Sequence, residues 1–225
     1  MIRINNLSKS FGSLHVLKNI CMDFEKGRVY GIVGDNGAGK TTLFRCIAGF
    51  ESYEGEVKCN LNPLKNHLGW LPTEPFLFPK ITGKEYLQLL GNARHQKIQS
   101  FDELNVFDLP LNQYASTYST GMKKKLALTA LLLQKNEVFI LDEPFNGVDI
   151  QSNILLTAII QKLKEHCRTV IISSHIFSTL SDTCDSISLL KHGDFTRIVQ
   201  RPDFADLEIQ LRETIIGTRL DHLSF

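Results

Sequence analysis

The sequence predicts an α/β fold with a largely parallel sheet, interrupted by a lobe that is mostly helical. Two observations support this prediction. Short apolar runs typical of buried strands alternate with helix-like segments along much of the chain. A glycine-rich loop that ends in Gly-Lys-Thr also stands between one such run and the next helical segment. With 225 residues, the chain is long enough to bury one substantial core.

The residue patterns predict an antiparallel layer, a helix and three buried strands. Residues 1–28 and 53–61 alternate apolar and polar side chains, which favours a more antiparallel layer. A helix is expected over Lys40–Phe50, directly after the glycine-rich loop. Three short apolar runs, each followed by a helical segment, are expected to be buried strands: Val29–Gly34, Val138–Leu141 and Thr169–Ser173.

The middle of the chain lacks this β pattern. Leu87, Leu89 and Leu90 have helical character, as do residues 126–133, and prolines punctuate the stretch. We therefore expect one domain over residues 1–225. Its expected parts are a core over about 1–72 and 136–200, a helical lobe over about 73–135, and a short tail over about 201–225 with a helix at Asp203–Ile216.

Composition argues against some classes of protein. The formal net charge of +1, from 25 basic and 24 acidic residues, gives no support for a nucleic-acid-binding surface. The five cysteines are scattered without a Cys-x-x-Cys pair, so we expect reduced thiols in a cytosolic protein. We also expect neither a signal peptide nor a membrane span, because the apolar stretches are too short. If the protein serves a membrane, it does so through a partner.

The strongest single motif is Gly34-Asp35-Asn36-Gly37-Ala38-Gly39-Lys40-Thr41, followed by Thr42. It matches G-x-x-x-x-G-K-[ST] in full. Glycines let the backbone curl so that N–H groups face a phosphate, and the next helix directs its positive end to the same place. We expect Lys40 to reach the β- and γ-phosphates and the Thr41 hydroxyl to bind Mg²⁺. The motif predicts a nucleotide-phosphate binder, and the absence of Asn-Lys-x-Asp weighs against a GTPase.

Two adjacent carboxylates, Asp142 and Glu143, end the apolar run that begins at Val138. The end of a strand in a parallel sheet is where ligands bind. We expect Asp142 to hold Mg²⁺ through its water shell. Glu143, aimed elsewhere, is expected to orient or deprotonate the attacking water. A solvated acidic pair at an ordinary turn is the plainer alternative.

Together with three further segments, these motifs resemble those of ABC (ATP-binding cassette) transporter ATPases over nearly the whole chain. The stretch from Asp142 to Asp149 is similar to the family's second acidic motif and the loop that ends in aspartate. Tyr118-Ser119-Thr120-Gly121-Met122 stands where the family has its Leu-Ser-Gly-Gly-Gln signature. Ser173-Ser174-His175 matches the position of the switch histidine, and Phe11 that of the aromatic residue that stacks on adenine.

The resemblance implies a P-loop NTPase (RecA-like) core with an antiparallel β subdomain and an inserted α-helical subdomain. It also implies a head-to-tail dimer, in which ATP lies between the phosphate loop of one copy and the signature of the other. Ser119 and the Gly121 backbone would contact the γ-phosphate across that dimer. His175 would contact the same phosphate and position the water, and Asp149 would help to shape the opposite site.

Each of these residues has a plainer interpretation when it is taken alone. Phe11 is one of 14 phenylalanines and would ordinarily pack in a core. His175 would be a structural histidine, and Ser119 a helix N-cap. The run Lys123-Lys124-Lys125 suggests a phosphate or lipid patch, but three lysines on a helix are usually a solvated face.

The chain departs from the family pattern in two places. The signature has Tyr118, Thr120 and Met122 at altered positions but keeps Ser119 and Gly121, so we expect a working site. The family also has a Mg²⁺-binding glutamine near the entry to the helical lobe, and that position falls on Thr73 here. Either the Thr73 hydroxyl, acting through water, or Glu74, after a shift of one residue, would take its place.

We therefore expect the ATP-binding, ATP-hydrolysing subunit of an ABC transporter, using ATP and Mg²⁺ on the cytoplasmic face of the cell membrane. It would pair head to tail with itself or a related cassette. A separate multi-span membrane subunit would dock around residues 73–110, and export is favoured because the tail is short. The alternatives are a regulatory cassette and a non-transport ABC ATPase that acts on DNA or ribosomes.

Overall fold

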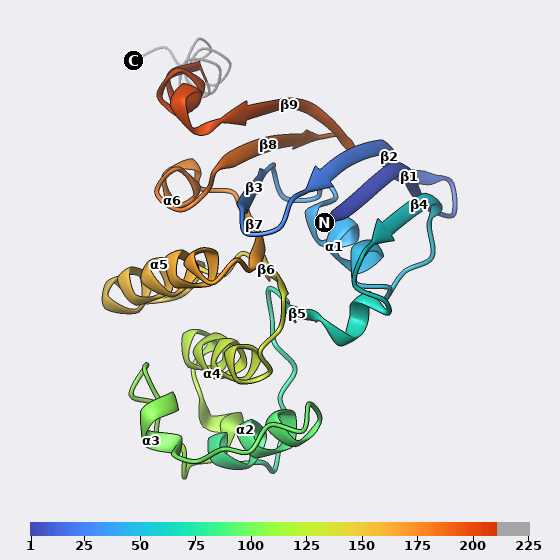
Figure 1. The fold of residues 1–225 in the computed structure, drawn as a ribbon. Helices are drawn as coiled ribbons and strands as arrows, with labels where there is room; N and C mark the ends of the chain where they lie inside the picture. Colours follow the sequence, from blue (N-terminus) through green and yellow to red (C-terminus); the bar gives the residue numbers. More distant parts are fainter. Residues whose placement is uncertain (211–225) are drawn as a thin grey trace, which may run out of the picture.

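Two β-sheets organise the molecule, which the computed structural model describes over residues 1–210 (Figure 1). The smaller sheet is antiparallel, and its strand order is β2–β1–β4. This confirms the antiparallel layer expected from residues 1–28 and 53–61. Its strands are β1 (Ile2–Phe11), β2 (Leu14–Phe24) and β4 (Glu54–Cys59).

The larger sheet has the order β5–β6–β7–β3–β8–β9, and only β9 runs antiparallel to its neighbour. The three strands that the sequence predicted lie side by side in its centre as β6, β7 and β3. The strands beyond them were not predicted, because β5 is short, two serines interrupt β8, and β9 is mostly exposed. The strands are β3 (Val29–Val33), β5 (Leu68–Leu71), β6 (Val138–Asp142), β7 (Thr169–Ser174), β8 (Ser186–Lys191) and β9 (Asp194–Gln200).

Each face of the larger sheet buries its own apolar core, because successive residues of a strand point to opposite faces. On β6, Val138 and Ile140 belong to a core shared with the antiparallel sheet, whereas Phe139 and Leu141 belong to one shared with the other helices. The first core encloses α1 (Lys40–Ile47). The second is covered by α4 (Thr120–Leu133), α5 (Ile150–Glu165) and α6 (Phe177–Ser181).

Helix α1 ends earlier than the predicted Lys40–Phe50. Gly49 has a φ of 79°, a left-handed conformation that glycine adopts without a steric penalty. The Phe50 and Gly49 N–H groups donate to the carbonyls of Arg45 and Cys46, which is the hydrogen-bond pattern of a Schellman C-cap. The glycine therefore stops the helix before Phe50.

The stretch between β5 and β6 is mostly helical and lies apart from the antiparallel sheet (Figure 1). It contains α2 (Gly83–Asn92), α3 (Phe101–Leu104) and α4, and α2 packs on α4. Short 3₁₀ turns occur at Leu64–Asn66, Ala115–Thr117 and Arg201–Asp203. Of the helix expected over Asp203–Ile216, residues 204–210 are helical, and the remainder lies outside the described residues.

No helix within residues 1–210 is both long enough and apolar enough to cross a bilayer.

Candidate active site

The glycine-rich loop joins the end of β3 to the start of α1, and two of its glycines adopt conformations that other residues avoid. Gly37 and Gly39 have φ values of 84° and 108°. Gly34 is required for a different reason: a Cβ there would lie 2.5 Å from the carbonyl oxygen of Leu190. The loop can therefore fold tightly against β8 while its backbone curls around an open space.

Lys40, the first residue of α1, extends its side chain back under this loop. Its Nζ donates to the carbonyl oxygens of Gly34 at 2.6 Å and Asp35 at 3.3 Å. The same Nζ forms an ion pair with Glu143 Oε1 at 3.5 Å, and only 7% of the lysine is exposed. A buried ammonium group held by carbonyl oxygens is well placed to attract an anion above the loop.

Asp142 is the last residue of β6 and is almost fully buried. Its Oδ2 accepts a hydrogen bond from the Thr41 hydroxyl at 2.6 Å. Its Oδ1 accepts one from the Ser173 hydroxyl, on β7, at 2.5 Å. The carboxylate is thus fixed between the start of α1 and the neighbouring strand.

Glu143 follows directly but points to other partners. Its backbone is left-handed, with φ of 50°, and its N–H donates to Ser173 Oγ at 2.9 Å. Its Oε2 accepts from Nδ1 of His175 at 2.8 Å, while its Oε1 faces Lys40. The two adjacent carboxylates therefore take separate sets of contacts, one toward Thr41 and one toward Lys40 and His175.

These side chains line one pocket of about 450 Å³ at the carboxyl ends of β3, β6 and β7, where ligands bind in parallel sheets. Val16 and Asn146 also line it, and the sequence reasoning missed both. Asn146 could have been predicted, because it lies in the loop directly after Glu143. Val16 could not, because it lies on β2 and no motif marks it. The predicted residues in the lining are Asp35, Asn36, Gly37, Gly39, Lys40, Thr41, Thr42, Thr73, Asp142, Glu143 and His175.

The predicted Gly34 and Ala38 belong to the loop backbone behind this lining. Phe11, at the end of β1, lies outside it. The phenylalanine is 48% exposed, so the core-packing alternative is wrong. Lys9 Nζ lies over this ring, 4.7 Å from its centroid, in a cation–π contact.

The predicted Ser119 and Gly121 stand at the start of α4 and are also outside the lining. The exposed Ser119 is the N-cap of this helix and accepts from the Met122 N–H at 3.2 Å. Gly121 packs on the loop after β6, because a Cβ there would lie 2.6 Å from the Gly147 carbonyl oxygen. Tyr118 replaces the usual leucine, and its hydroxyl donates to the Pro110 carbonyl at 2.8 Å.

The predicted Asp149 caps α5. Its carboxylate accepts from the N–H and hydroxyl of Ser152, both at 2.8 Å, and from Lys125 Nζ at 3.1 Å. The hydrogen bonds from Ser152 are the main cause that holds the pKa of Asp149 well below its ordinary value, and Lys125 adds to it. The carboxylate is therefore fixed beside the loop that leads from the pocket.

The lysine run on α4 is not a solvated face. Lys125 contacts Asp149, and Lys124 is only 3% exposed. Lys124 points inward and donates to the backbone oxygens of Glu143 and Asn146. The expectation was wrong because this side of α4 faces the loop after β6 and the start of α5, which the sequence did not show.

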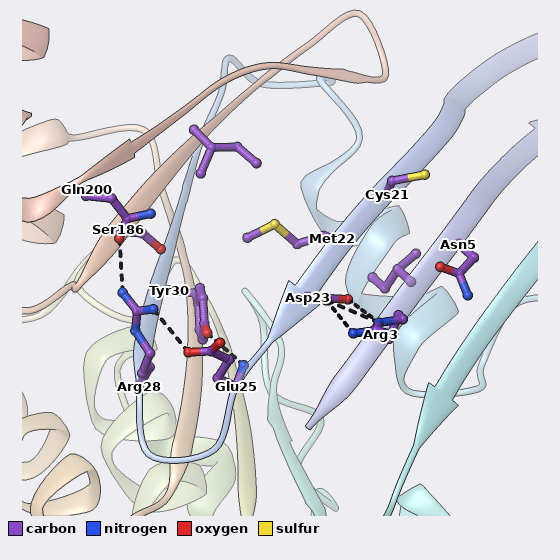
Figure 2. Close-up of a pocket in the computed structure, with 12 residues that line it drawn as sticks. Arg3, Asn5, Cys21, Met22, Asp23, Glu25, Arg28, Tyr30, Ser186 and Gln200 are labelled. Carbon is purple, nitrogen blue, oxygen red and sulfur yellow. Dashed lines mark hydrogen bonds and ion pairs between the residues drawn. The ribbon is translucent and has the colours of Figure 1, made fainter.

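A second groove, of about 540 Å³, lies between β2 and the β8–β9 edge (Figure 2). Its charged side chains pair with one another. Arg3 binds Asp23 in a bidentate ion pair, and Arg28 contacts both Glu25 and Gln200. The predicted site residues do not line this groove. Volume alone therefore does not identify the site.

Comparisons with known proteins agree with this architecture. The ABC transporter family model matches residues 17–146. An uncharacterized ABC transporter ATP-binding protein of Methanocaldococcus jannaschii is 34% identical over 200 residues, covering 85% of this chain and 74% of that protein. A solved ATP-binding subunit of an ABC transporter has a TM-score of 0.79 and 25% identity, covering 94% of both chains. A dimeric ATP-binding cassette in a post-hydrolysis state with ADP and phosphate has a TM-score of 0.80 at 21% identity, covering 89% of this chain and 99% of that one.

Proposed function

Because this chain belongs to the ABC transporter family and is an ATP-binding, ATP-hydrolysing subunit of it, we propose that the pocket at the ends of β3, β6 and β7 is its hydrolytic site. The main support for this proposal is that the Glu143 carboxylate contacts Lys40 through one oxygen and His175 through the other. Lys40 Nζ lies 3.5 Å from Glu143 Oε1, and Glu143 Oε2 lies 2.8 Å from His175 Nδ1. A phosphate binder, a carboxylate base and a histidine thus meet within one pocket.

In this site Lys40 and the loop N–H groups bind the β- and γ-phosphates. The Glu143 carboxylate accepts a proton from water as the water oxygen attacks the γ-phosphorus and the bond to the ADP oxygen breaks. The phosphate product leaves with the oxygen of that water. His175, whose side chain is 43% exposed, contacts the γ-phosphate and keeps Glu143 aimed at the water.

The pocket also suits Mg²⁺, which prefers oxygen ligands. The Thr41 hydroxyl and the Asp142 carboxylate lie 2.6 Å apart, and Thr73 lines the same pocket. We assign these three residues to the ion, with Thr73 rather than the exposed Glu74, which lies outside the described lining. Mg²⁺ bound there would neutralise part of the negative charge on the phosphate oxygens.

Ser119 and Gly121 complete the site across a head-to-tail dimer in this proposal. Three features support it: the exposed start of α4, the position of both residues outside the pocket of their own chain, and the dimeric cassette of similar fold. Phe11 offers an exposed ring for stacking on adenine. Asp149 is the N-cap of α5, at the end of the loop that leads from the pocket, and would help to shape the opposite site of the dimer.

We place the work of this ATPase at the cytoplasmic face of a membrane, where a separate multi-span subunit moves the solute. Closure on ATP and reopening after hydrolysis would drive that subunit between two states. The expected docking region around residues 73–110 carries the exposed Phe76 and Phe78, whose rings meet edge to face. The direction of transport stays a prediction.

The test is phosphate release by Glu143→Gln, with Asp102→Asn, a carboxyl-to-amide change on α3, as the matched control. We expect Glu143→Gln to lose about 100-fold or more of the turnover rate while it still binds ATP. Sizing of the same variant with Mg-ATP should give a dimer that wild type does not accumulate. Hydrolysis by Glu143→Gln at the wild-type rate would contradict the assigned base.

A further inference from the structure

Lys124 lies where the helical lobe meets the turn that carries Glu143. It stands on α4, close after Ser119, and only 3% of it is exposed. Its Nζ donates to the carbonyl oxygen of Glu143 at 2.7 Å and to that of Asn146 at 2.8 Å. Among the described residues, no carboxylate forms an ion pair with this ammonium group. Its direct partners are two backbone oxygens of one turn.

A buried lysine is costly unless its hydrogen bonds are made. Burial lowers the pKa of Lys124, and the nearby carboxylates of Glu143, Asp142 and Glu74 act in the opposite direction. An apolar side chain would fill the same space without this cost. The lysine is therefore best explained by what it holds.

Lys124 holds the backbone segment that sets the direction of the Glu143 side chain. Glu143 has a left-handed φ of 50°, which residues other than glycine adopt only when their surroundings enforce it. Its N–H is bound by Ser173 Oγ and its carbonyl oxygen by Lys124 Nζ. The second contact, to the Asn146 carbonyl oxygen, spans the turn after it. The direction of the Glu143 carboxylate thus follows from contacts on both sides of its backbone.

We propose that Lys124 is a positioning residue, which ties the start of α4 to the backbone of the base Glu143. The inference rests on the proposed function of Glu143 and on the dimer. In that dimer, Ser119 of one copy contacts the ATP held by the partner, while Glu143 acts on the ATP of its own chain. Lys124 therefore links the helix that begins beside Ser119 to the backbone of the base in the same chain.

The test compares Lys124→Met, Lys124→Arg and the control Lys123→Met, which removes the neighbouring, partly exposed lysine. Phosphate release gives kcat and KM, and a fluorescent ATP analogue gives nucleotide affinity. We expect Lys124→Met to lose roughly tenfold to hundredfold in kcat, as for a base misplaced by about 1 Å, with KM and nucleotide affinity within about twofold of wild type. Lys124→Arg should recover most of kcat, and Lys123→Met should match wild type.

The double variant Lys124→Met/Glu143→Gln isolates the pathway. If Lys124 acts through Glu143, the double variant is no slower than Glu143→Gln alone, because the two losses do not add. A merely structural lysine would instead slow the double variant further and lower the nucleotide affinity of Lys124→Met together with its kcat. If Lys124→Met does not fold, Lys124→Gln replaces it: its shorter, neutral amide keeps a weaker donor, so kcat should fall by less than is expected for Lys124→Met, with nucleotide affinity again unchanged.

Two results separate this inference from the proposed function. Wild-type kcat in Lys124→Met, beside an inactive Glu143→Gln, overturns the positioning role and leaves the base intact. Wild-type hydrolysis by Glu143→Gln overturns the base itself and, with it, the role of Lys124.

Discussion

The phosphate pocket and the start of α4 differ in how much of their chemistry one chain completes. In the pocket, Lys40, Asp142 and Glu143 are nearly buried and contact residues of the glycine-rich loop, α1 or β7. At the start of α4, Ser119 is exposed, and within residues 1–210 its hydroxyl bonds only to the first turn of its own helix. Both regions carry motifs that resemble the same family.

A motif can therefore be intact in a chain while the group it acts on is held by another surface. The pocket is organised before any other surface meets it, so its residues can act on a bound phosphate directly. The start of α4 offers a helix N-terminus and a free surface, which become useful only against an anion held elsewhere. Variants in the two regions should therefore differ in how far they lower hydrolysis, metal binding or stability.

The largest expected effect is a rescue between two inactive variants. Ser119→Ala and Glu143→Gln should each lose at least about tenfold in phosphate release, since one anion donor or the base is missing. In a head-to-tail dimer, mixing them in equal amounts creates pairs in which one site has both residues intact. Phosphate release by the mixture should then reach about a quarter of the wild-type rate.

Ser100→Ala is the matched control for this mixture, because Ser100 caps α3 as Ser119 caps α4. Each substitution should cost about 1 kcal/mol of stability through the lost cap, but only Ser119→Ala should lose activity. A mixture as inactive as its components would mean that Ser119 serves its own chain, and the contrast between the two regions would be gone.

A smaller effect is expected inside the pocket at Thr73. Thr73→Val keeps the shape of the side chain and removes its hydroxyl. We expect the Mg²⁺ concentration for half-maximal hydrolysis to rise roughly tenfold, as for other groups that support a metal site. Glu74→Gln, the matched neighbour, should change it less, because Glu74 is exposed. The reverse order, measured by titrating Mg²⁺ into the hydrolysis assay, would transfer the role to Glu74.

The smallest expected effect concerns the loop between the two regions. The folded pKa of Asp149 lies below its ordinary value of 3.8, so the carboxylate stabilises the fold fully above that value and loses this contribution as the pH falls. Asp149→Asn keeps a good N-cap but not the charge near Lys125. Its Tm should be slightly lower than that of wild type at pH 7, and the gap should narrow below pH 3.8. A gap that is independent of pH would mean that the charge is immaterial.

Much of the fold was predictable because the central strands are buried on both faces. Such strands appear as continuous apolar runs, and β3, β6 and β7 were found from those runs within a residue of their ends. The flanking strands β5, β8 and β9 lack this signal, since they are short, carry polar residues or are exposed on one side. Their pairing depends on neighbours far away in the sequence.

The candidate site divides in the same way. The loop that contains Lys40 and the pair Asp142–Glu143 could be recognised locally, because backbone curvature and strand ends are encoded in consecutive residues. The partners of these groups could not. Ser173 reaches Asp142 across two adjacent strands, and Val16 enters the pocket from the other sheet.

The class of fold, the phosphate loop and the order of the motifs could be read from the chain alone, because each is set by spacing over a few residues. The burial of Lys124 under Glu143 and the exposure of Phe11 became visible only once the chain was folded. So did the position of Thr73, rather than Glu74, in the lining of the pocket. Burial and hydrogen-bond partners depend on which segments pack together, and that packing minimises exposed apolar surface over the whole chain rather than within any one motif.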